Sequence, residues 1–369
     1  MRNGHNEYDK AMRRAIVLAA RGQGWTSPNP MVGAVIMRDG RILGEGWHQR
    51  YGGLHAEREA LKDCVKRGET TEGATMIVTL EPCCHQGKQP PCTEAIAAAG
   101  ITRVVTGSAD PNPLVNGGGV TWLREHGIEV FEGALRAECD RINPSFFHWI
   151  RTGRPYVTYK TAMTLDGKTA TRTGASQWVT GKDARQEVMA LRHVNRAIMV
   201  GVGTVLADDP SLTCRMENGR DPIRIIVDTD LRTPLDAAVV ATASTTPTWL
   251  ATCCIDESRR TAYRNTGCVL LDMPKDNGRV DLSAAMGEIG QRGIDSLLLE
   301  GGGTLAWSML HAGLVNHIRT YVAPKIFGGK QAHTPVEGLG IELPSESIAL
   351  ADMRIRHVGD DLAIDAEVA

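Results

Sequence analysis

The sequence of 369 residues has none of the features that mark a membrane-spanning, secreted or nucleic-acid-binding protein. No apolar run approaches the roughly 18 residues that a transmembrane helix needs. Basic side chains interrupt residues 1–20, which therefore differ from a signal peptide and instead suit a short amphipathic helix. Aromatic residues are scarce, at 5%, and 41 Lys and Arg residues balance 43 Asp and Glu residues. We therefore expect neither a nucleic-acid partner nor a membrane partner.

The cysteines indicate both a compartment and a site. They number nine and are spread along the chain, which argues against a secreted disulfide scaffold and for a reducing, cytoplasmic location. Three of them, Cys83, Cys84 and Cys92, fall within ten residues. Crowded cysteines in a reducing compartment indicate metal binding or catalysis.

Short β-rich runs alternate with helical stretches, which predicts an α/β fold with a largely parallel sheet. In the first half we expect helices at 55–66, 92–99 and 120–126, and strands at 31–36, 42–47, 75–80, 103–107 and 128–130. In the second half we expect helices at 183–193, 282–292 and 304–312, and strands at 156–162, 197–202, 224–228, 296–300 and 317–323. The segment 236–276 shows no clear pattern. Residues 151–155 have the composition of a linker, which predicts two domains, 1–150 and 151–369.

A zinc-ligand pattern stands in the first half. His55-Ala56-Glu57 begins one predicted helix, and Pro82-Cys83 and Cys92 stand at the start of the next. One imidazole and two thiolates leave the fourth position of a tetrahedral zinc ion (Zn²⁺) open for water. Glu57 lies beside the metal without being needed as a ligand, so it can move protons between the water and the leaving amine. The pattern predicts a hydrolytic deaminase with Glu57 as the catalytic residue.

The spacing leaves alternatives open. Eight residues separate Cys83 from Cys92, where the short form of the motif has two. Cys84 competes with Cys83 as a ligand, and His85 could also coordinate; a fourth protein ligand would make the zinc structural. A nucleic-acid deaminase is a further alternative, but it predicts a basic face and stacking aromatics.

Two glycine-rich segments in the second half, Gly201-Val202-Gly203 and Gly301-Gly302-Gly303, follow apolar strands and open predicted helices. Exposed amides at such positions bind phosphate, and glycine lets a pyrophosphate approach the backbone. The first segment lacks the third glycine of the dinucleotide fingerprint. For either segment alone a plain turn is the better interpretation, and the two together favour phosphate binding.

These motifs together resemble one family, the bifunctional riboflavin-biosynthesis deaminase/reductases. The residues that carry the resemblance are Pro28-Asn29-Pro30-Met31-Val32-Gly33, the zinc motif with its Pro90-Pro91-Cys92 ending, residues 160–168, residues 200–210 and residues 299–305. The resemblance implies a cytidine-deaminase-like zinc domain followed by a dihydrofolate-reductase-like domain. It also implies hydrolysis of the 2-amino group of 2,5-diamino-6-(5-phosphoribosylamino)pyrimidin-4(3H)-one, followed by NADPH-dependent reduction of the ribosyl side chain.

The expected substrate, a phosphorylated pyrimidine, suggests roles for further residues of the deaminase domain. Asn29 would hydrogen-bond the pyrimidine or the ribose, and His48 and Lys88 would contact the phosphate. Asp110 and Asn112 follow a strand at the edge where open α/β sheets bind ligands. Turn chemistry alone would also select Asn29, Asp110 and Asn112, and Lys88 could be a solvated loop residue.

For the reductase, the resemblance implies cofactor contacts from Ala162, Trp178, Thr204, Asp208, Thr229 and residues 302–308, which include Gly302, Gly303 and Thr304. It implies substrate contacts from Lys160, Ser176, Arg192, Leu212, Arg215 and Glu300. Arg192 and Arg215 suit a phosphate clamp, because a guanidinium matches phosphate oxygens in a bidentate way. Trp178 is also compatible with a core position. The choice of NADPH over NADH rests on the resemblance alone, and we expect a homo-oligomer.

Overall fold

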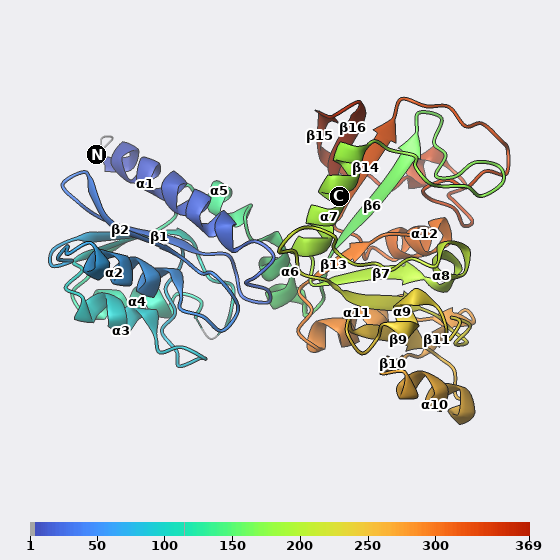
Figure 1. Cartoon of the computed structure of the whole chain (residues 1–369). Helices are drawn as coiled ribbons and strands as arrows, with labels where there is room; N and C mark the ends of the chain where they lie inside the picture. The colour runs from blue at the N-terminus through green and yellow to red at the C-terminus, as the bar shows by residue number, and fades with distance from the viewer. Residues whose placement is uncertain (1–3, 114) are drawn as a thin grey trace. The chain divides into compact units, whose positions relative to one another are not determined.

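The computed structural model describes residues 4–113 and 115–369 and divides the chain into two compact units, Met1–Thr152 and Gly153–Ala369 (Figure 1). The first three residues of the predicted N-terminal helix lie outside the described residues. Helix α6 (Pro144–Thr152) continues two residues into the predicted linker, and Gly153 follows it with φ of 69°. The connection to the first strand of the second unit is therefore confined to residues 153–155.

The first unit is a five-stranded sheet with helices on both faces. Its strands are β1 (Gly33–Arg38), β2 (Arg41–Trp47), β3 (Thr75–Leu80), β4 (Arg103–Ser108) and β5 (Glu129–Phe131). Its helices are α1 (Gly4–Ala19), the 3-10 helix η1 (Ala20–Gly22), α2 (Ala56–Lys66), α3 (Cys92–Ala98), α4 (Gly118–Glu125), α5 (Arg136–Asp140) and α6. The order is β2-β1-β3-β4-β5, with β1 antiparallel to both neighbours and β3, β4 and β5 parallel.

Alternate residues of the central strands fill two separate cores, because successive side chains of a strand point to opposite faces. Ala34 and Ile36 pack on α2, α3 and α4, whereas Val35 and Met37 pack on α1. Figure 1 shows α1 and α2 on opposite faces of the sheet. Strand β3 is buried along its whole length. Gly46 lets α2 lie close to β2, since a Cβ there would stand 2.3 Å from the Ala60 backbone nitrogen. This contact fixes the start of α2, where two predicted site residues stand.

The second unit is built on a nine-stranded sheet. Its strands are β6 (Tyr156–Thr164), β7 (Ala197–Gly201), β8 (Ile223–Val227), β9 (Thr248–Thr252), β10 (Val269–Asp272), β13 (Ser296–Leu299), β14 (His317–Ala323), β15 (Leu350–Val358) and β16 (Asp361–Val368), with β11 (Lys275–Asp276) and β12 (Arg279–Val280) as a separate pair. Its helices are α7 (Lys182–Val194), α8 (Val202–Asp208), α9 (Ala238–Ala241), α10 (Glu257–Asn265), α11 (Leu282–Gln291), α12 (Gly303–His311) and the 3-10 helix η2 (Pro344–Glu346).

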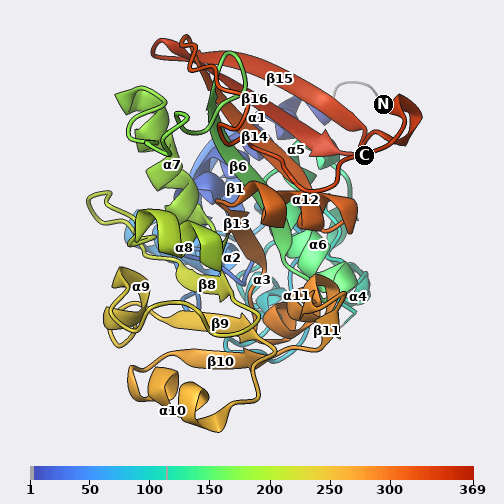
Figure 2. The ribbon, with the colours of Figure 1, turned by 90° about the vertical axis from the view of Figure 1, so that its right-hand side faces the viewer.

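Figure 2 shows these strands following one another from β10 at the bottom to β15 at the top. Strands β7, β13, β6 and β14 are consecutive and parallel, and β13 lies between β7 and β6 although it comes later in the chain. One core packs α11 and α12 on one face, and another packs α8, α9 and α10 on the other. The loops that follow β7 and β13 therefore leave the same edge of the sheet side by side.

The predicted α/β architecture is confirmed, because strands and helices alternate in both units. Several elements were not predicted from the sequence pattern. Residues 236–276 contain α9, β9, α10, β10 and β11, and the C-terminal hairpin β15–β16 was not predicted. Strand β15 shifts register between Ala351 and Arg354, with Asp352 at φ of 49°, so its alternation is broken. Within the described chain, every helix is too short or too polar to span a bilayer.

Candidate active sites

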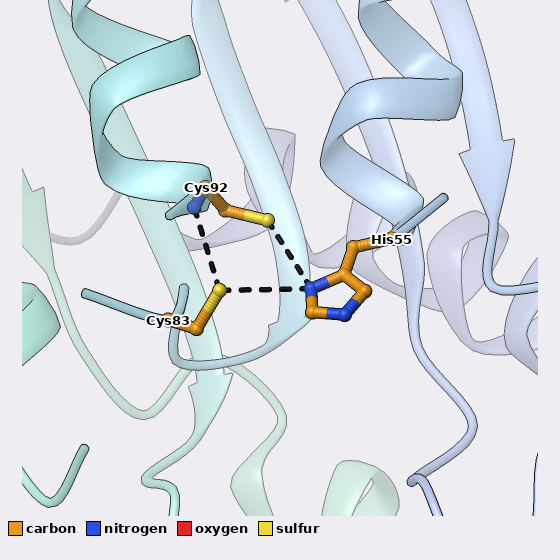
Figure 3. A group of neighbouring side chains, drawn as sticks. All are labelled: His55, Cys83 and Cys92. Carbon is orange, nitrogen blue, oxygen red and sulfur yellow. Dashed lines mark hydrogen bonds between the residues drawn. The ribbon is translucent and has the colours of Figure 1, made fainter. Parts of the chain in front are cut away.

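Three side chains that are far apart in the sequence meet beyond the end of β3. His55 is the N-cap of α2, Cys92 is the first residue of α3, and Cys83 lies in the loop after β3. Figure 3 shows the three side chains pointing toward one another, and their ligand atoms all lie within 4.8 Å. His55 Nδ1 is 3.6 Å from Cys83 Sγ and 3.4 Å from Cys92 Sγ. One imidazole and two thiols form a donor set that suits zinc.

The Cys83 thiol is more acidic than an ordinary cysteine. Its hydrogen bond with the Cys92 thiol, and a further one with His55, lower the pKa of Cys83 to about 4. A thiol must lose its proton to become a metal ligand. The interpretation that both ligand segments open helices is wrong for Cys83, because α3 begins only at Cys92. Instead, the Cys92 backbone N–H donates to the Cys83 carbonyl oxygen at 3.0 Å.

The two competing ligands stand apart from this group. Among the described residues, the metal-binding group contains neither Cys84 nor His85. The Cys84 sulfur lies beside Gly118, where an added Cβ would be 3.0 Å away, and His85 lines a cavity. Three protein ligands leave a coordination position for water, which is the arrangement of a catalytic zinc site.

Glu57 is the acid that accompanies this group. It is the second residue of α2, is 4% exposed and lines the same cavity as His55 and Cys83. Burial raises the pKa of Glu57 above that of an ordinary carboxyl group. A carboxyl group with a raised pKa exchanges protons more readily near neutral pH.

The cavity also collects the predicted substrate residues of the first unit. Asn29, His48 and Lys88 all line it, together with Asp110 and Asn112. His48 Nδ1 donates to the Leu54 carbonyl oxygen at 2.9 Å, and its Nε2 accepts from the Asn29 amide at 3.2 Å. Burial lowers the pKa of His48, so the ring is neutral near neutral pH. In this arrangement the His48 ring contacts the Asn29 amide on one side and the Leu54 carbonyl oxygen on the other.

The second unit holds a buried ion-pair cluster. Glu300, directly after β13, accepts from Arg192 of α7 at 2.8 Å and 3.0 Å and from Lys160 of β6 at 3.3 Å. Burial raises the pKa of Glu300, but Lys160 and Arg192 outweigh it and lower that pKa to about 2. The cluster is therefore an ionised carboxylate between two cations, at the edge of the sheet where ligands bind in α/β folds.

The glycine-rich loops lie beside this cluster. An added Cβ at Gly301 would stand 3.1 Å from the Thr204 hydroxyl of α8, so the loops after β13 and β7 touch. Gly302 has φ of 73°, which favours glycine. At Gly303 a Cβ would stand 2.9 Å from the Thr334 carbonyl oxygen. The backbone is therefore tightly packed on one side, and residues with side chains would not fit.

Comparison with known proteins decides the family. Residues 5–108 match the cytidine and deoxycytidylate deaminase zinc-binding region, and residues 155–364 match the RibD C-terminal domain. The chain is 50% identical to the riboflavin biosynthesis protein RibD of Actinobacillus pleuropneumoniae over 96% of this chain and 93% of that protein. The chain belongs to the RibD family.

Solved RibD structures share the whole fold. RibD of Acinetobacter baumannii is 34% identical with a TM-score of 0.88, covering 99% of both chains. A diaminohydroxyphosphoribosylaminopyrimidine deaminase/5-amino-6-(5-phosphoribosylamino)uracil reductase of Thermotoga maritima is 34% identical with a TM-score of 0.85, covering 100% of both. The chain is thus a bifunctional deaminase and reductase of riboflavin biosynthesis. The cofactors of this family, zinc and NADPH, are those that the sequence predicted.

The other predicted reductase residues of this RibD protein occupy varied environments. Trp178 is 58% exposed and stacks under Arg185, with the Arg185 guanidinium carbon 4.7 Å from the ring centroid, so it is not a core residue. Leu212 is 2% exposed and belongs to a buried core cluster. The remaining residues are half-buried or exposed, and they lie on β6, α8 or α12 or in loops: Ala162, Ser176, Asp208, Arg215, Thr229 and Thr304.

Sequence reasoning missed several residues of the RibD deaminase cavity. Glu81 accepts backbone hydrogen bonds from Gly117, Gly119 and Val120 at 3.0–3.1 Å, and so ties the start of α4 to the zinc-ligand loop. Its position directly before Pro82-Cys83 was an available signal. Tyr51 and Phe146 also line the cavity, and no motif marks either of them.

Proposed function

We propose that the first unit hydrolyses the 2-amino group of 2,5-diamino-6-(5-phosphoribosylamino)pyrimidin-4(3H)-one. The second unit then reduces the ribosyl side chain to ribityl, giving 5-amino-6-(5-phosphoribitylamino)uracil. The observation that carries the proposal is the buried Glu57 beside a three-ligand group in one cavity. The name of the Thermotoga maritima relative supports the same pair of reactions.

In the deamination, His55, Cys83 and Cys92 would hold zinc. A bound zinc ion lowers the pKa of water at its open position and so supplies a nucleophile near neutral pH. Glu57 accepts the proton of the attacking water and delivers it to the ring nitrogen, and then helps protonate the leaving amine. The water oxygen forms the new bond to carbon, the carbon–nitrogen bond breaks, and ammonia leaves. The deaminated ring is a uracil.

Substrate recognition in this cavity uses Asn29 and Lys88. His48 fixes the Asn29 amide, so that its oxygen stays available to the pyrimidine or the ribose. Lys88 is the lysine among the residues that line the described cavity, and no arginine is among them. Lys88 therefore binds the phosphate.

In the reduction, Lys160 and Glu300 stand where the substrate meets the cofactor. NADPH supplies a hydride when bound. The ribosylamine opens to an imine, C1 accepts the hydride and its nitrogen gains a proton, so the substrate gains two hydrogens in all. Glu300, with a pKa of about 2, accepts hydrogen bonds and cannot deliver that proton. Lys160, 3.3 Å from Glu300, is the charged donor and supplies it.

The two predicted phosphate arginines of the reductase have different roles. Arg192 Nε and Nη2 are engaged by Glu300, and its Nη1 donates to the Thr213 carbonyl oxygen at 2.9 Å. Arg215 lies exposed two residues beyond Thr213. Arg215 is thus the residue that binds the substrate phosphate, while Arg192 holds Glu300. The pyrophosphate of NADPH binds at Gly302, Gly303 and Thr304, next to Thr204.

The organisation of the protein is part of the proposal. Domains of 1–150 and 151–369 are supported by separate cores and by the division between Thr152 and Gly153. A homo-oligomer is supported by the edge strand β15, which exposes Met353 and Ile355 and offers unpaired backbone groups to a second copy. A cytoplasmic location is supported by the nine cysteines, among which no disulfide forms.

The deciding experiment incubates the full chain with the diaminopyrimidinone ribosyl phosphate, with and without NADPH, and follows the products by mass spectrometry. We expect exchange of an amine for oxygen without NADPH, and a further gain of two hydrogens only with NADPH. Exchange without reduction would contradict the proposal for the second unit. No exchange by a zinc-loaded protein would contradict the proposal for the first.

A further inference from the structure

The loop between the two cysteine ligands, residues 84–91, is fastened to the segment before α2 and to the first turn of α2. Lys88 Nζ lies 4.0 Å from the centroid of the Tyr51 ring. The Gln89 side chain donates to the Gly52 carbonyl oxygen at 3.2 Å, and Arg58 Nη2 donates to the Pro91 carbonyl oxygen at 2.9 Å. The loop therefore has a defined position over the cavity.

Tyr51 is itself anchored. It lies between β2 and α2, and its backbone N–H donates to the Trp25 carbonyl oxygen at 2.9 Å. Its side chain is 45% exposed and lines the deaminase cavity together with Lys88. A fixed backbone under a half-exposed ring gives Lys88 a firm surface on which to rest.

The contact between Tyr51 and Lys88 has an energetic consequence for binding. A free lysine on a loop samples many rotamers, and that freedom is lost when the ammonium group binds a phosphate. An ammonium group over a tyrosine ring is attracted by the negative face of the ring. The ring therefore restricts Lys88 to the cavity side of the loop before substrate arrives, and part of the ordering cost is removed.

We propose that Tyr51 is a positioning residue that holds Lys88 toward the substrate phosphate, and so sets the preference of the deaminase site for phosphorylated over phosphate-free substrate. This inference rests on the proposed function, in which Lys88 binds the phosphate. Tyr51 contacts Lys88 and is not required to contact the reacting atoms.

The test uses full-length, zinc-loaded protein and measures deamination of the phosphorylated substrate and of the same compound after phosphatase treatment. Tyr51→Ala should raise KM for the phosphorylated substrate about two- to fivefold, the range for an exposed cation–π contact, with kcat unchanged. It should leave kcat/KM for the phosphate-free compound unchanged. Tyr51→Phe keeps the ring and should restore the low KM. Zinc content and melting temperature report on folding in each variant.

A double-mutant cycle with Lys88→Ala makes the test specific. If Tyr51 acts through Lys88, Tyr51→Ala should have no further effect in the Lys88→Ala background. An equal loss for both substrates, or a loss that persists without Lys88, would overturn the inference and indicate direct contact between the Tyr51 ring and the pyrimidine. If Lys88→Ala raises KM and Tyr51→Ala does not, the positioning role of Tyr51 is wrong and the assignment of Lys88 to the phosphate still stands. If Lys88→Ala has no effect, the assigned role of Lys88 fails as well.

Discussion

Arg192 holds the carboxylate of Glu300 with two parallel hydrogen bonds, of 2.8 Å from Nε and 3.0 Å from Nη2. Such a fork fixes both the position and the plane of the carboxylate, which a lysine cannot do. The two residues are 108 positions apart and come from α7 and from the loop after β13. The relationship supports the proposal that Arg192 holds Glu300 and that Arg215 binds the substrate phosphate.

Replacing Arg192 with lysine should therefore impair reduction. Loss of one charged hydrogen bond is worth about 1.5–3 kcal/mol, so kcat/KM for the reductase should fall roughly 10- to 100-fold. NADPH oxidation at 340 nm measures the effect, and deamination by the same variant should stay normal. Lys182→Ala, an exposed change on the same helix, is the matched control. Unchanged NADPH oxidation by Arg192→Lys would contradict the supporting role.

Replacing Glu57 with glutamine should abolish deamination without loss of metal. A proton-transfer residue contributes about 10²- to 10⁴-fold, and glutamine keeps the shape of the side chain but cannot carry the proton. Ammonia release measures the rate, and elemental analysis measures zinc. Glu59→Gln, two residues further along α2, should retain activity. A loss of zinc in Glu57→Gln would mean that Glu57 supports the metal site and would remove the basis for its catalytic assignment.

The ligand set can be tested one cysteine at a time. Cys83→Ser and Cys92→Ser should each lose zinc and deaminase activity, because both sulfurs lie within reach of His55 Nδ1. Cys84→Ser should keep one zinc per chain, since its sulfur lies beside Gly118. Stripping the metal with a chelator should stop deamination and spare reduction. Zinc loss in Cys84→Ser alone would exchange the assignments of Cys83 and Cys84.

The stability of the second unit should depend on Asp365 in a pH-specific way. Burial raises the pKa of Asp365, but hydrogen bonds from His317 and Arg319 outweigh it and lower that pKa to about 2. The folded-state pKa lies below the unfolded value of about 3.9, so the ionised group stabilises the fold above about pH 4 and this contribution is lost as the pH falls toward 2.

The predicted contribution is about 2 kcal/mol at pH 7, or about 4–8 °C in melting temperature. Asp365→Asn should therefore melt several degrees lower than the parent protein at pH 7, and the difference should shrink toward pH 2.5. Calorimetry at several pH values measures it. Asp352→Asn, on the exposed strand β15, should melt like the parent at each pH. A pH-independent difference for Asp365→Asn would argue against the ionisation as its cause.

The two units should work separately. Each has its own sheet and its own cores, and the connection is residues 153–155. Expressed alone, residues 1–152 should deaminate the diaminopyrimidinone phosphate, and residues 153–369 should reduce the deaminated product. Rates within about threefold of the full chain are expected if neither site borrows residues from the other unit. An inactive but folded fragment would show that its site is completed by the missing half.

The deaminase site could be predicted from the sequence because its ligands stand at element boundaries that short motifs mark. His55 caps α2 and Cys92 opens α3, so spacing and turn chemistry place both. The strands of the central sheets were predictable from their continuous apolar runs, as in β3 and β13. The general α/β class followed from the alternation of those runs with amphipathic helices.

Contacts between distant segments could not be predicted in the same way. The pairing of Arg192 with Glu300 depends on β13 entering the sheet between β7 and β6, an order that no local pattern encodes. The contact of Tyr51 with Lys88 depends on how two loops fold over each other. Lone residues such as Leu212, which the fold buries in a core, carry no local sign of their surroundings.

The two ends of the loop from Cys84 to Pro91 lie close together, at the Cys83 carbonyl oxygen. The Cys92 and Thr93 backbone N–H groups both donate to the Cys83 carbonyl oxygen, at 3.0 Å and 3.2 Å, so the two ends are joined whatever the segment between them contains. Its length and composition can therefore change without moving either sulfur. In a hydrolytic centre built this way, the loop and the metal ligands can change independently. A different loop sequence can accommodate a new substrate while the ligand positions stay the same.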